Sequence, residues 1–278
     1  MLQHEYAQHV FALLADGLRG GGGDMRAFVD EFTDDATLWL PPAPDTSSPY
    51  RGREAIRALL VDAMLPRYQD GLQLTLYGLL ETTGRALYQF EDSAVQRDGT
   101  KYQGSPCIAL GFDGSQIVSF HQYRGAPGFF APCLDPAATR DGVDTTARDI
   151  AIAAFAELQQ GLMGDRAAMD AFLGRFADNA RLWFPPTPNT QSPYVGPAAA
   201  ATLFREVLVP MYPQGLRTTV YHTLAAGTRT AFELQSSGQR ADGSVYINSP
   251  CLCLDIRAGR IRALWEHWGG PGYFAPVS

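Results

Sequence analysis

The chain has 278 residues, of which 46% are hydrophobic and 18% charged, a balance typical of a globular protein long enough for two domains. Its net charge of −7 disfavours nucleic acid as a partner, because the phosphate backbone would be repelled. The apolar runs are too short to cross a bilayer, and the first ten residues lack the pattern of a secretory signal. We therefore expect a cytoplasmic protein without a membrane partner.

The chain repeats itself. The segment LWLPPAPDTSSPYRG at 38–52 returns as LWFPPTPNTQSPYVG at 182–196, with the tryptophans separated by 183 − 39 = 144 residues. The same offset, without a gap, joins further pairs: Tyr50 with Tyr194, Tyr77 with Tyr221, Cys107 with Cys251, and Phe130 with Phe274. A repeat of this length indicates a tandem duplication of one domain. We predict a first domain at 1–133, a polar linker at 134–146 and a second domain at 147–278.

Each copy begins with helices and ends with strands. In the first copy, apolar residues at helical spacing predict helices over 6–18, 25–32 and 52–64, with a short strand at 34–42 before the third helix. Four strands are then expected at 72–80, 85–95, 101–112 and 116–124. Asp-Gly dipeptides at 98–99 and 242–243 are strong hairpin signals. Helices followed by a run of antiparallel strands predict an α+β unit, with the helices on one side of a curved sheet.

Several strings resemble the nuclear transport factor 2-like superfamily, which includes ketosteroid isomerase, SnoaL-type polyketide cyclases and limonene epoxide hydrolase. They are FTDDATLWLPP, FADNARLWFPP, RGREAI, GSQIVSFHQYRG and GRIRALWEHWGG. The resemblance implies two tandem cone-shaped α+β barrels, each with a pocket between sheet and helices. It also implies pairing through the back of the sheet, expected here between the two copies as an intramolecular pseudo-dimer. Further homo-dimerisation stays open.

The isomerase chemistry is not expected to carry over. The resemblance places the isomerases' base carboxylate at Leu40 and Phe184, and their hydrogen-bonding acid near Ile108 and Leu252, and none of these residues is acidic. The resemblance therefore supplies a pocket, and other residues must supply the chemistry.

Strand alternation predicts which of the candidate polar residues share a face of the sheet. Gln89 and Glu91 share one face of their strand, and Glu233 and Gln235 share the matching face in the second copy. The resemblance implies that this polar face lines the pocket and that the apolar face meets the other repeat. Two carboxylates in one dry pocket raise each other's pKa, whereas a carboxylate beside an arginine stays ionised. The candidate catalytic residues are Glu233, Glu266, Glu91 and Arg124, and the candidate substrate-binding residues are Tyr50, Tyr194, Gln89, Gln122, Gln235, Asn248, Tyr102, Tyr246 and Trp268.

The candidate residues also have interpretations that involve no catalysis or binding. The polar rows could face water on an open sheet. Tyr50 and Tyr194 could pin their loops instead of reaching the pocket mouth. His121 and His267 could act as bases, but alternation puts them opposite Gln122 and Glu266. The four cysteines form no metal-binding pattern and no redox or phosphate motif is present, so we expect no cofactor.

The sequence favours a cofactor-independent cyclase, isomerase or epoxide-hydrolase-like enzyme of secondary metabolism. It would act by general acid–base catalysis on an apolar, polyketide- or terpenoid-like small molecule. The alternative is a non-catalytic small-molecule-binding or assembly module of the same fold. The sequence leaves open which of the two pockets is active.

Overall fold

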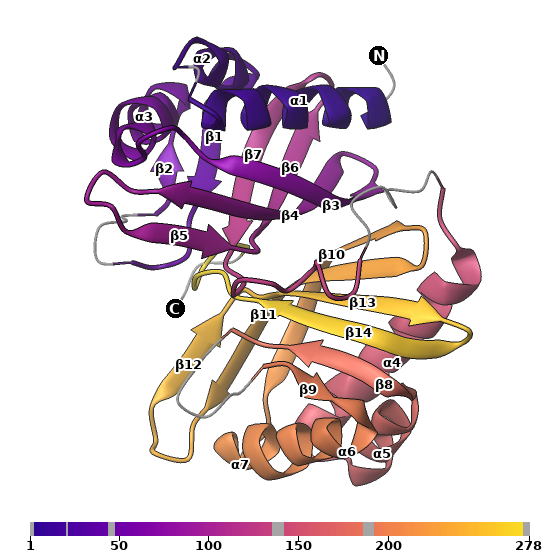
Figure 1. Cartoon of the computed structure of the whole chain (residues 1–278). Helices are drawn as coiled ribbons and strands as arrows, with labels where there is room; N and C mark the ends of the chain where they lie inside the picture. The colour runs from indigo at the N-terminus through magenta and orange to yellow at the C-terminus, as the bar shows by residue number, and fades with distance from the viewer. Residues whose placement is uncertain (1–2, 21, 44–47, 135–141, 186–191, 275–278) are drawn as a thin grey trace. The chain divides into compact units, whose positions relative to one another are not determined.

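The chain forms two compact units, Met1–Thr139 (unit 1) and Arg140–Ser278 (unit 2), each of which combines helices with a sheet (Figure 1). The computed structural model describes residues 3–20, 22–43, 48–134, 142–185 and 192–274. Most of the predicted linker and part of each proline-rich loop lie outside the described residues. The predicted α+β class is confirmed for both units.

Unit 1 contains, in chain order, α1 (Gln3–Leu18), α2 (Gly22–Asp30), β1 (Phe32–Trp39), β2 (Tyr50–Arg51), α3 (Arg53–Arg57), β3 (Gln73–Thr82), β4 (Arg85–Val95), β5 (Lys101–Gly104), β6 (Cys107–Asp113) and β7 (Gln116–Tyr123). Helix α3 continues as the π-helical segment η1 (Ala58–Met64) and the 3₁₀ turn η2 (Leu65–Arg67).

Unit 2 repeats this order as α4 (Thr145–Leu162), α5 (Arg166–Gly174), β8 (Phe176–Trp183), β9 (Tyr194–Val195), α6 (Gly196–Ala201), β10 (Arg217–Ala226), β11 (Arg229–Gln239), β12 (Val245–Asn248), β13 (Cys251–Arg257) and β14 (Arg260–His267). Helix α6 continues as the π-helical segment η3 (Thr202–Leu208) and then as α7 (Val209–Met211).

The two sheets have the same strand order. It is β2-β1-β7-β6-β4-β3 in unit 1 and β9-β8-β14-β13-β11-β10 in unit 2, with β5 and β12 paired to β4 and β11. Neighbouring strands are antiparallel except β1 with β7 and β8 with β14, which are parallel. The mainly antiparallel sheet follows from the short connections, since antiparallel strands can be joined by tight hairpins.

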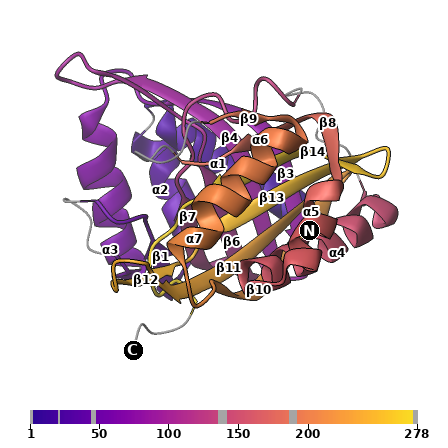
Figure 2. The ribbon, with the colours of Figure 1, turned by 90° about the horizontal axis from the view of Figure 1, so that it is seen from below.

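The helices pack on one face of each sheet, and Figure 2 shows those of unit 2 crossing its strands. In unit 1, the Tyr88 hydroxyl of β4 donates to the Ala7 carbonyl of α1 at 2.9 Å, and the Tyr88 and Phe11 rings stack at 5.1 Å. In unit 2, Phe155 of α4 stacks on Phe232 of β11 at 4.5 Å. The apolar row of each long central strand therefore faces the helices of its own unit.

Short polar residues fix the ends of elements, as their types predict. Asp144 and Asp165 cap α4 and α5 by accepting the backbone N–H groups of Ala147 and Ala168, both at 3.0 Å. The hairpin between β4 and β5 turns at Gly99, whose φ of 84° favours glycine, and the second copy turns at the matching glycine. Both predicted Asp-Gly hairpins are confirmed.

Several predicted boundaries differ, and Phe32, expected at the end of the second helix, begins β1. The strand expected over 101–112 is two strands, because Pro106 has no N–H to donate to the ladder and the chain bends there. Helix α4 begins at Thr145, two residues inside the predicted linker, because the Asp144 cap fixes its start. The predicted domains 1–133 and 147–278 fall inside the two compact units.

In the part of the chain that the structure describes, no helix is long and apolar enough to cross a membrane.

Candidate functional site

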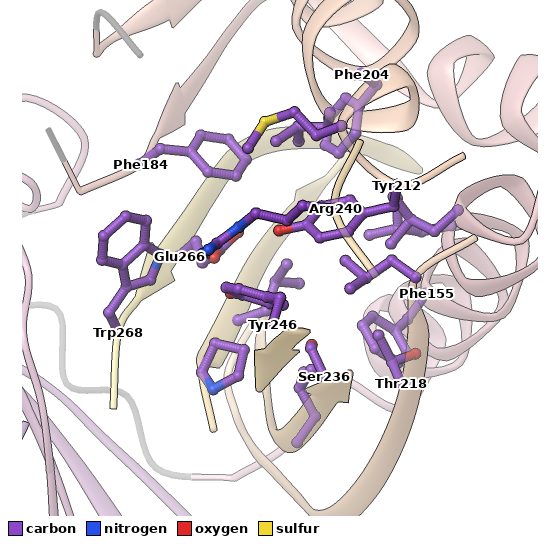
Figure 3. Close-up of a pocket in the computed structure, with 18 of the residues that line it drawn as sticks. Phe155, Phe184, Phe204, Tyr212, Thr218, Ser236, Arg240, Tyr246, Glu266 and Trp268 are labelled. Atoms are coloured by element: carbon purple, nitrogen blue, oxygen red, sulfur yellow. Dashed lines mark hydrogen bonds between the residues drawn. The ribbon is translucent and has the colours of Figure 1, made fainter. Parts of the chain in front are cut away.

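Unit 2 contains a cavity of about 410 Å³ between its helices and the inner face of its sheet (Figure 3). This volume is within the range of small-molecule sites, roughly 300–1,000 Å³. Its lining is mostly apolar: Phe155, Leu158, Leu162, Phe184, Phe204, Leu208, Met211, Leu216, Leu234, Pro250 and Leu252. The other lining residues are Tyr212, Thr218, Ser236, Arg240, Asp242, Tyr246, Glu266 and Trp268.

Glu266 of β14 is the enclosed acid of this cavity. Loss of hydration raises the pKa of its carboxyl from an ordinary 4.5 to about 7, while a hydrogen bond from Trp268 acts in the opposite direction. That bond joins Trp268 Nε1 to Glu266 Oε1 at 2.9 Å. Glu266 keeps some accessible surface, and this surface is the cavity wall that a ligand would meet. Near neutral pH, the carboxyl is therefore present in both protonation states and can give or take a proton.

Two tyrosines and an arginine lie around the same cavity. The Tyr212 and Tyr246 rings are 5.3 Å apart, and the Arg240 guanidinium carbon lies 5.0 Å from the centre of the Tyr246 ring. Burial, reinforced by the charge of Glu266, raises the pKa of both phenols, although Arg240 lowers each in part. Both phenols are therefore neutral hydrogen-bond donors at physiological pH. Arg240 adds a positive charge beside them.

The structure corrects the predicted face of β11. Leu234 and Ser236 line the cavity, so Glu233 and Gln235 point away from it by strand alternation. Glu233 is fully buried on that other face, so the open-sheet alternative is wrong there too. The prediction that Glu233 and Glu266 share a pocket is therefore wrong. Alternation groups Glu233 with Gln235 on one face of β11, but it does not say which face lines the cavity. A wrong choice of face moves every residue of the strand to the other side, and here the polar row is not the row that lines the cavity.

The same correction applies to β4 in unit 1. Gln89 is fully buried and lies opposite the helix-facing row of Tyr88 and Phe90. Glu91 lies on the same outer face as Gln89, where its Oε1 accepts the backbone N–H groups of Phe130 and Ala131 at 3.2 and 3.0 Å. Glu91 anchors the segment that follows β7 and does not belong to an inner-face site.

The remaining candidates of the last strands lie where alternation places them. Gln122 pairs with the core residue Ile108 in register, which puts it on the inner face of unit 1. Burial raises the pKa of Tyr102, and Arg124, although exposed, is close enough for its charge to oppose that rise in part. His267 lies on the face opposite Glu266 and outside the cavity lining.

The other predicted binding residues of unit 2 border the cavity without lining it. Asn248 pairs with Ser236 in register and forms a side-chain hydrogen bond with Tyr246. Tyr194 packs edge-on against the lining residue Phe184, with ring centres 6.4 Å apart.

The serine of each SPY motif is hydrogen-bonded to the residue that follows the first strand of its unit. Ser48 Oγ bonds to the backbone N and O of Leu40, and Ser192 Oγ bonds to those of Phe184. Tyr50, like Tyr194, packs against the apolar core of its unit. Both tyrosines are therefore held against the core of their unit, and Tyr194 is not among the residues that line the cavity.

Sequence reasoning missed six polar residues, which are Tyr212, Thr218, Ser236, Arg240 and Asp242 of the cavity lining and Asp92 of unit 1. A signal for two of them existed. Asp92 and Ser236 are separated by the repeat offset and interrupt the apolar row that begins with Phe90 and Leu234. Because both copies have a polar residue at this position of an otherwise apolar row, the position is a candidate for ligand binding in each domain.

The positions that the superfamily resemblance assigns to isomerase acids do line the cavity. They are Phe184 and Leu252, and both are apolar. The acid of this cavity has a different position, at Glu266.

No family model matches the chain, and no curated protein matches it. Several solved structures do match parts of the chain. An NTF2-like protein from Anabaena variabilis ATCC 29413 is 22% identical, with a TM-score of 0.40, and the match covers 45% of this chain and 90% of the other. The Δ5-3-ketosteroid isomerase of a Mycobacterium species is 19% identical, with a TM-score of 0.37 and coverages of 43% and 92%. A SnoaL-like protein from Jannaschia sp. CCS1 is 14% identical, with a TM-score of 0.38 and coverages of 46% and 89%.

Each match spans nearly all of a smaller protein and less than half of this chain. The chain is similar to proteins named NTF2-like and SnoaL-like, the group that its sequence resembles. At these identities the similarity concerns the fold alone.

Proposed function

We propose that unit 2 is a cofactor-independent acid–base enzyme for an apolar small molecule. The observation that carries this proposal is an enclosed carboxyl, Glu266, whose pKa is raised to about 7 on the wall of an otherwise apolar cavity. A general acid or base is most effective when its pKa is close to the working pH. The size and apolar lining of the cavity suit a ligand of a few fused rings, such as a polyketide- or terpenoid-like metabolite.

The proposed chemistry is a proton transfer at the end of the cavity where Glu266 and the tyrosines meet. As a carboxylate, Glu266 takes a proton from a carbon acid or from water. As a carboxylic acid, it gives a proton to an oxygen or carbon of the substrate. Tyr212 and Tyr246, both neutral, donate hydrogen bonds to an oxygen that gains negative charge. Cyclisation, isomerisation and hydrolytic ring opening all contain such a step.

The test compares two glutamates that differ in their face of the sheet. Purified protein is incubated with a panel of lipophilic ketones, epoxides and polyketide-like aromatics, and products are detected by mass spectrometry and chiral chromatography. Glu266→Gln keeps the shape of the side chain and should cut turnover by at least about a hundredfold, the usual scale for an acid–base group. Glu233→Gln, the matched control on the other face, should leave turnover within about twofold. Equal turnover of wild type and Glu266→Gln would overturn the proposal.

A binding module without catalysis is the second candidate. Of the two carboxyls that line the cavity, only Glu266 is enclosed, because Asp242 is exposed at the rim. The cavity therefore has no second enclosed acid to share a proton transfer, which favours a binding role. One acid is enough to select a ligand by hydrogen bonding. Tight binding of a panel compound that is recovered unchanged, with affinity lost in Glu266→Gln, would identify this role.

A further inference from the structure

The two units keep an inner-face carboxyl, but on different strands. The residue that corresponds to Glu266 in unit 1 is Gln122, and the residue that corresponds to Ser236 of the cavity lining is Asp92. The acid thus lies on β14 in unit 2 and on β4 in unit 1. A unit that had become only a structural partner would have no reason to hold a carboxylate at such a position, because burying one is costly.

Asp92 is a buried acid with unused hydrogen-bonding capacity. It is 7% exposed, and its Oδ2 accepts a hydrogen bond from the Tyr102 hydroxyl at 3.3 Å. Its Oδ1 is buried and has no hydrogen-bond partner among the described residues. Loss of hydration raises the pKa of Asp92 to about 7, the Tyr102 hydrogen bond and its own backbone N–H lower it, and the charge of Glu91 raises it slightly further. A buried acceptor without a donor is rare in proteins and calls for an explanation.

The strand neighbours of Asp92 are arranged around its carboxyl. In register, Asp92 lies between Leu74 of β3 and Gly104 of β5. A Cβ atom at Gly104 would lie 2.6 Å from Asp92 Oδ1 and 2.9 Å from the Tyr102 hydroxyl, so only glycine leaves room for this pair.

The matching row of unit 2 is built differently. Ser236 lies there between Thr218 and Asn248, so the smaller hydroxyl has polar neighbours and the place of Gly104 is taken by asparagine. The glycine and the carboxyl therefore occur together in one unit and are replaced together in the other.

The rest of the cluster adds a second aromatic ring and a cation. The Tyr68 ring lies 6.0 Å from the Tyr102 ring, and both side chains are only partly buried. Arg124 is exposed beside them, and its charge lowers the pKa of Tyr102 against the larger effect of burial. A molecule that reaches the tyrosines from solvent would thus meet an aromatic wall with a cation at its edge and the Asp92 carboxyl behind it.

We propose that Asp92, Tyr102 and Tyr68 form a second ligand site, in unit 1, for a small molecule with an apolar ring body and a hydroxyl or N–H group that donates to Asp92 Oδ1. The site does not depend on the proposed catalysis in unit 2, since the two sites share no residue. The chain would then hold two ligands in differently arranged sites rather than one ligand twice.

The test uses a pair of probes that differ only in a hydrogen-bond donor, 2-naphthol and 2-methoxynaphthalene. Binding is followed by NMR of methyl-labelled isoleucine and leucine. Ile108 reports on unit 1, because it lies on the inner face, and Leu252, which lines the cavity, reports on unit 2. Above pH 7, where Asp92 is ionised, 2-naphthol should bind at Ile108 at least about tenfold more tightly than 2-methoxynaphthalene, since a hydrogen bond to a charged acceptor has about that effect.

Two matched truncations decide the assignment. Asp92→Ala should remove the preference for 2-naphthol at Ile108, whereas Ser236→Ala, the same truncation at the equivalent position of unit 2, should preserve it. Asp92→Asn, which keeps the shape and one acceptor, should reduce the preference by at least about threefold and serves as the test if the alanine variant does not fold. An equal affinity for the two probes at Ile108 in wild type, or a preference that survives in the Asp92 variants, would overturn the proposal. Either result would leave the Glu266 test unaffected.

Discussion

Replacing Glu266 by glutamine should stabilise the ligand-free protein above neutral pH. Glutamine has the same shape and can still accept the Trp268 hydrogen bond, but it has no charge that burial would penalise. Enclosed acids of this kind reduce stability in exchange for reactivity, so removing the charge should increase the free energy of unfolding.

The magnitude and sign follow from the pKa of Glu266. Below pH 4.5 the acid is protonated in both the folded and the unfolded chain, and wild type and variant should be equally stable. Between pH 4.5 and 7 the unfolded chain releases the proton while the folded protein keeps it, so wild type loses stability relative to the variant as pH rises. A rise in pKa from 4.5 to about 7 corresponds to about 3 kcal/mol, which should be reached above pH 7.

The assay is urea unfolding of wild type and Glu266→Gln at several pH values from about 5 to 8. Asp92 also titrates in this range, but it is present in both proteins, so the difference between them reports on Glu266 alone. Carbon-13 NMR of labelled glutamate side chains gives the pKa of the folded protein directly. A difference in unfolding free energy that does not change with pH, or a folded-state pKa for Glu266 below about 5, would refute the reasoning.

Three further changes test single contacts. Trp268→Phe removes the hydrogen bond that lowers the pKa of Glu266, so the NMR titration midpoint of Glu266 should move above about 7; a lower midpoint would contradict this. Glu91→Gln should weaken the anchor of the two backbone amides after β7 and reduce the free energy of unfolding by about 1–2 kcal/mol, with turnover in unit 2 unchanged. Gly104→Ala should displace the Asp92 carboxyl and lower the melting temperature of the protein, and an unchanged melting temperature would mean that the carboxyl can move aside freely.

Much of the fold could be predicted from local sequence. Helical spacing, Asp-Gly turns and the repeat offset each depend on a few neighbouring residues, and the structure contains the corresponding elements. The expectation that Glu266 and Trp268 lie in the second pocket depended on the family resemblance and not on alternation alone, and both residues line the cavity.

The face of the central strands could not be predicted in the same way. Alternation establishes that Glu233 and Gln235 share a face, but it does not establish which face is enclosed by helices. The usual guide is that the polar row is the wet one, and this fails where residues of both rows are fully buried, as at Gln89 and its neighbour Tyr88. Asp92 was missed for the same reason, since it lies in the apolar row that was assigned to the wrong side.

The π-helical segments have a consequence for redesign of the cavity. Both units contain one at the same place, Ala58–Met64 and Thr202–Leu208, and the second contributes Phe204 and Leu208 to the cavity lining. A π-helical turn holds one residue more than an α-helical turn and leaves the helix on either side in phase, so deleting one residue there should restore α-helical winding without rotating the residues after it. The extra residue of this segment can thus be removed without changing which later side chains point inward. Such a deletion should alter the wall of the chamber only at the segment itself.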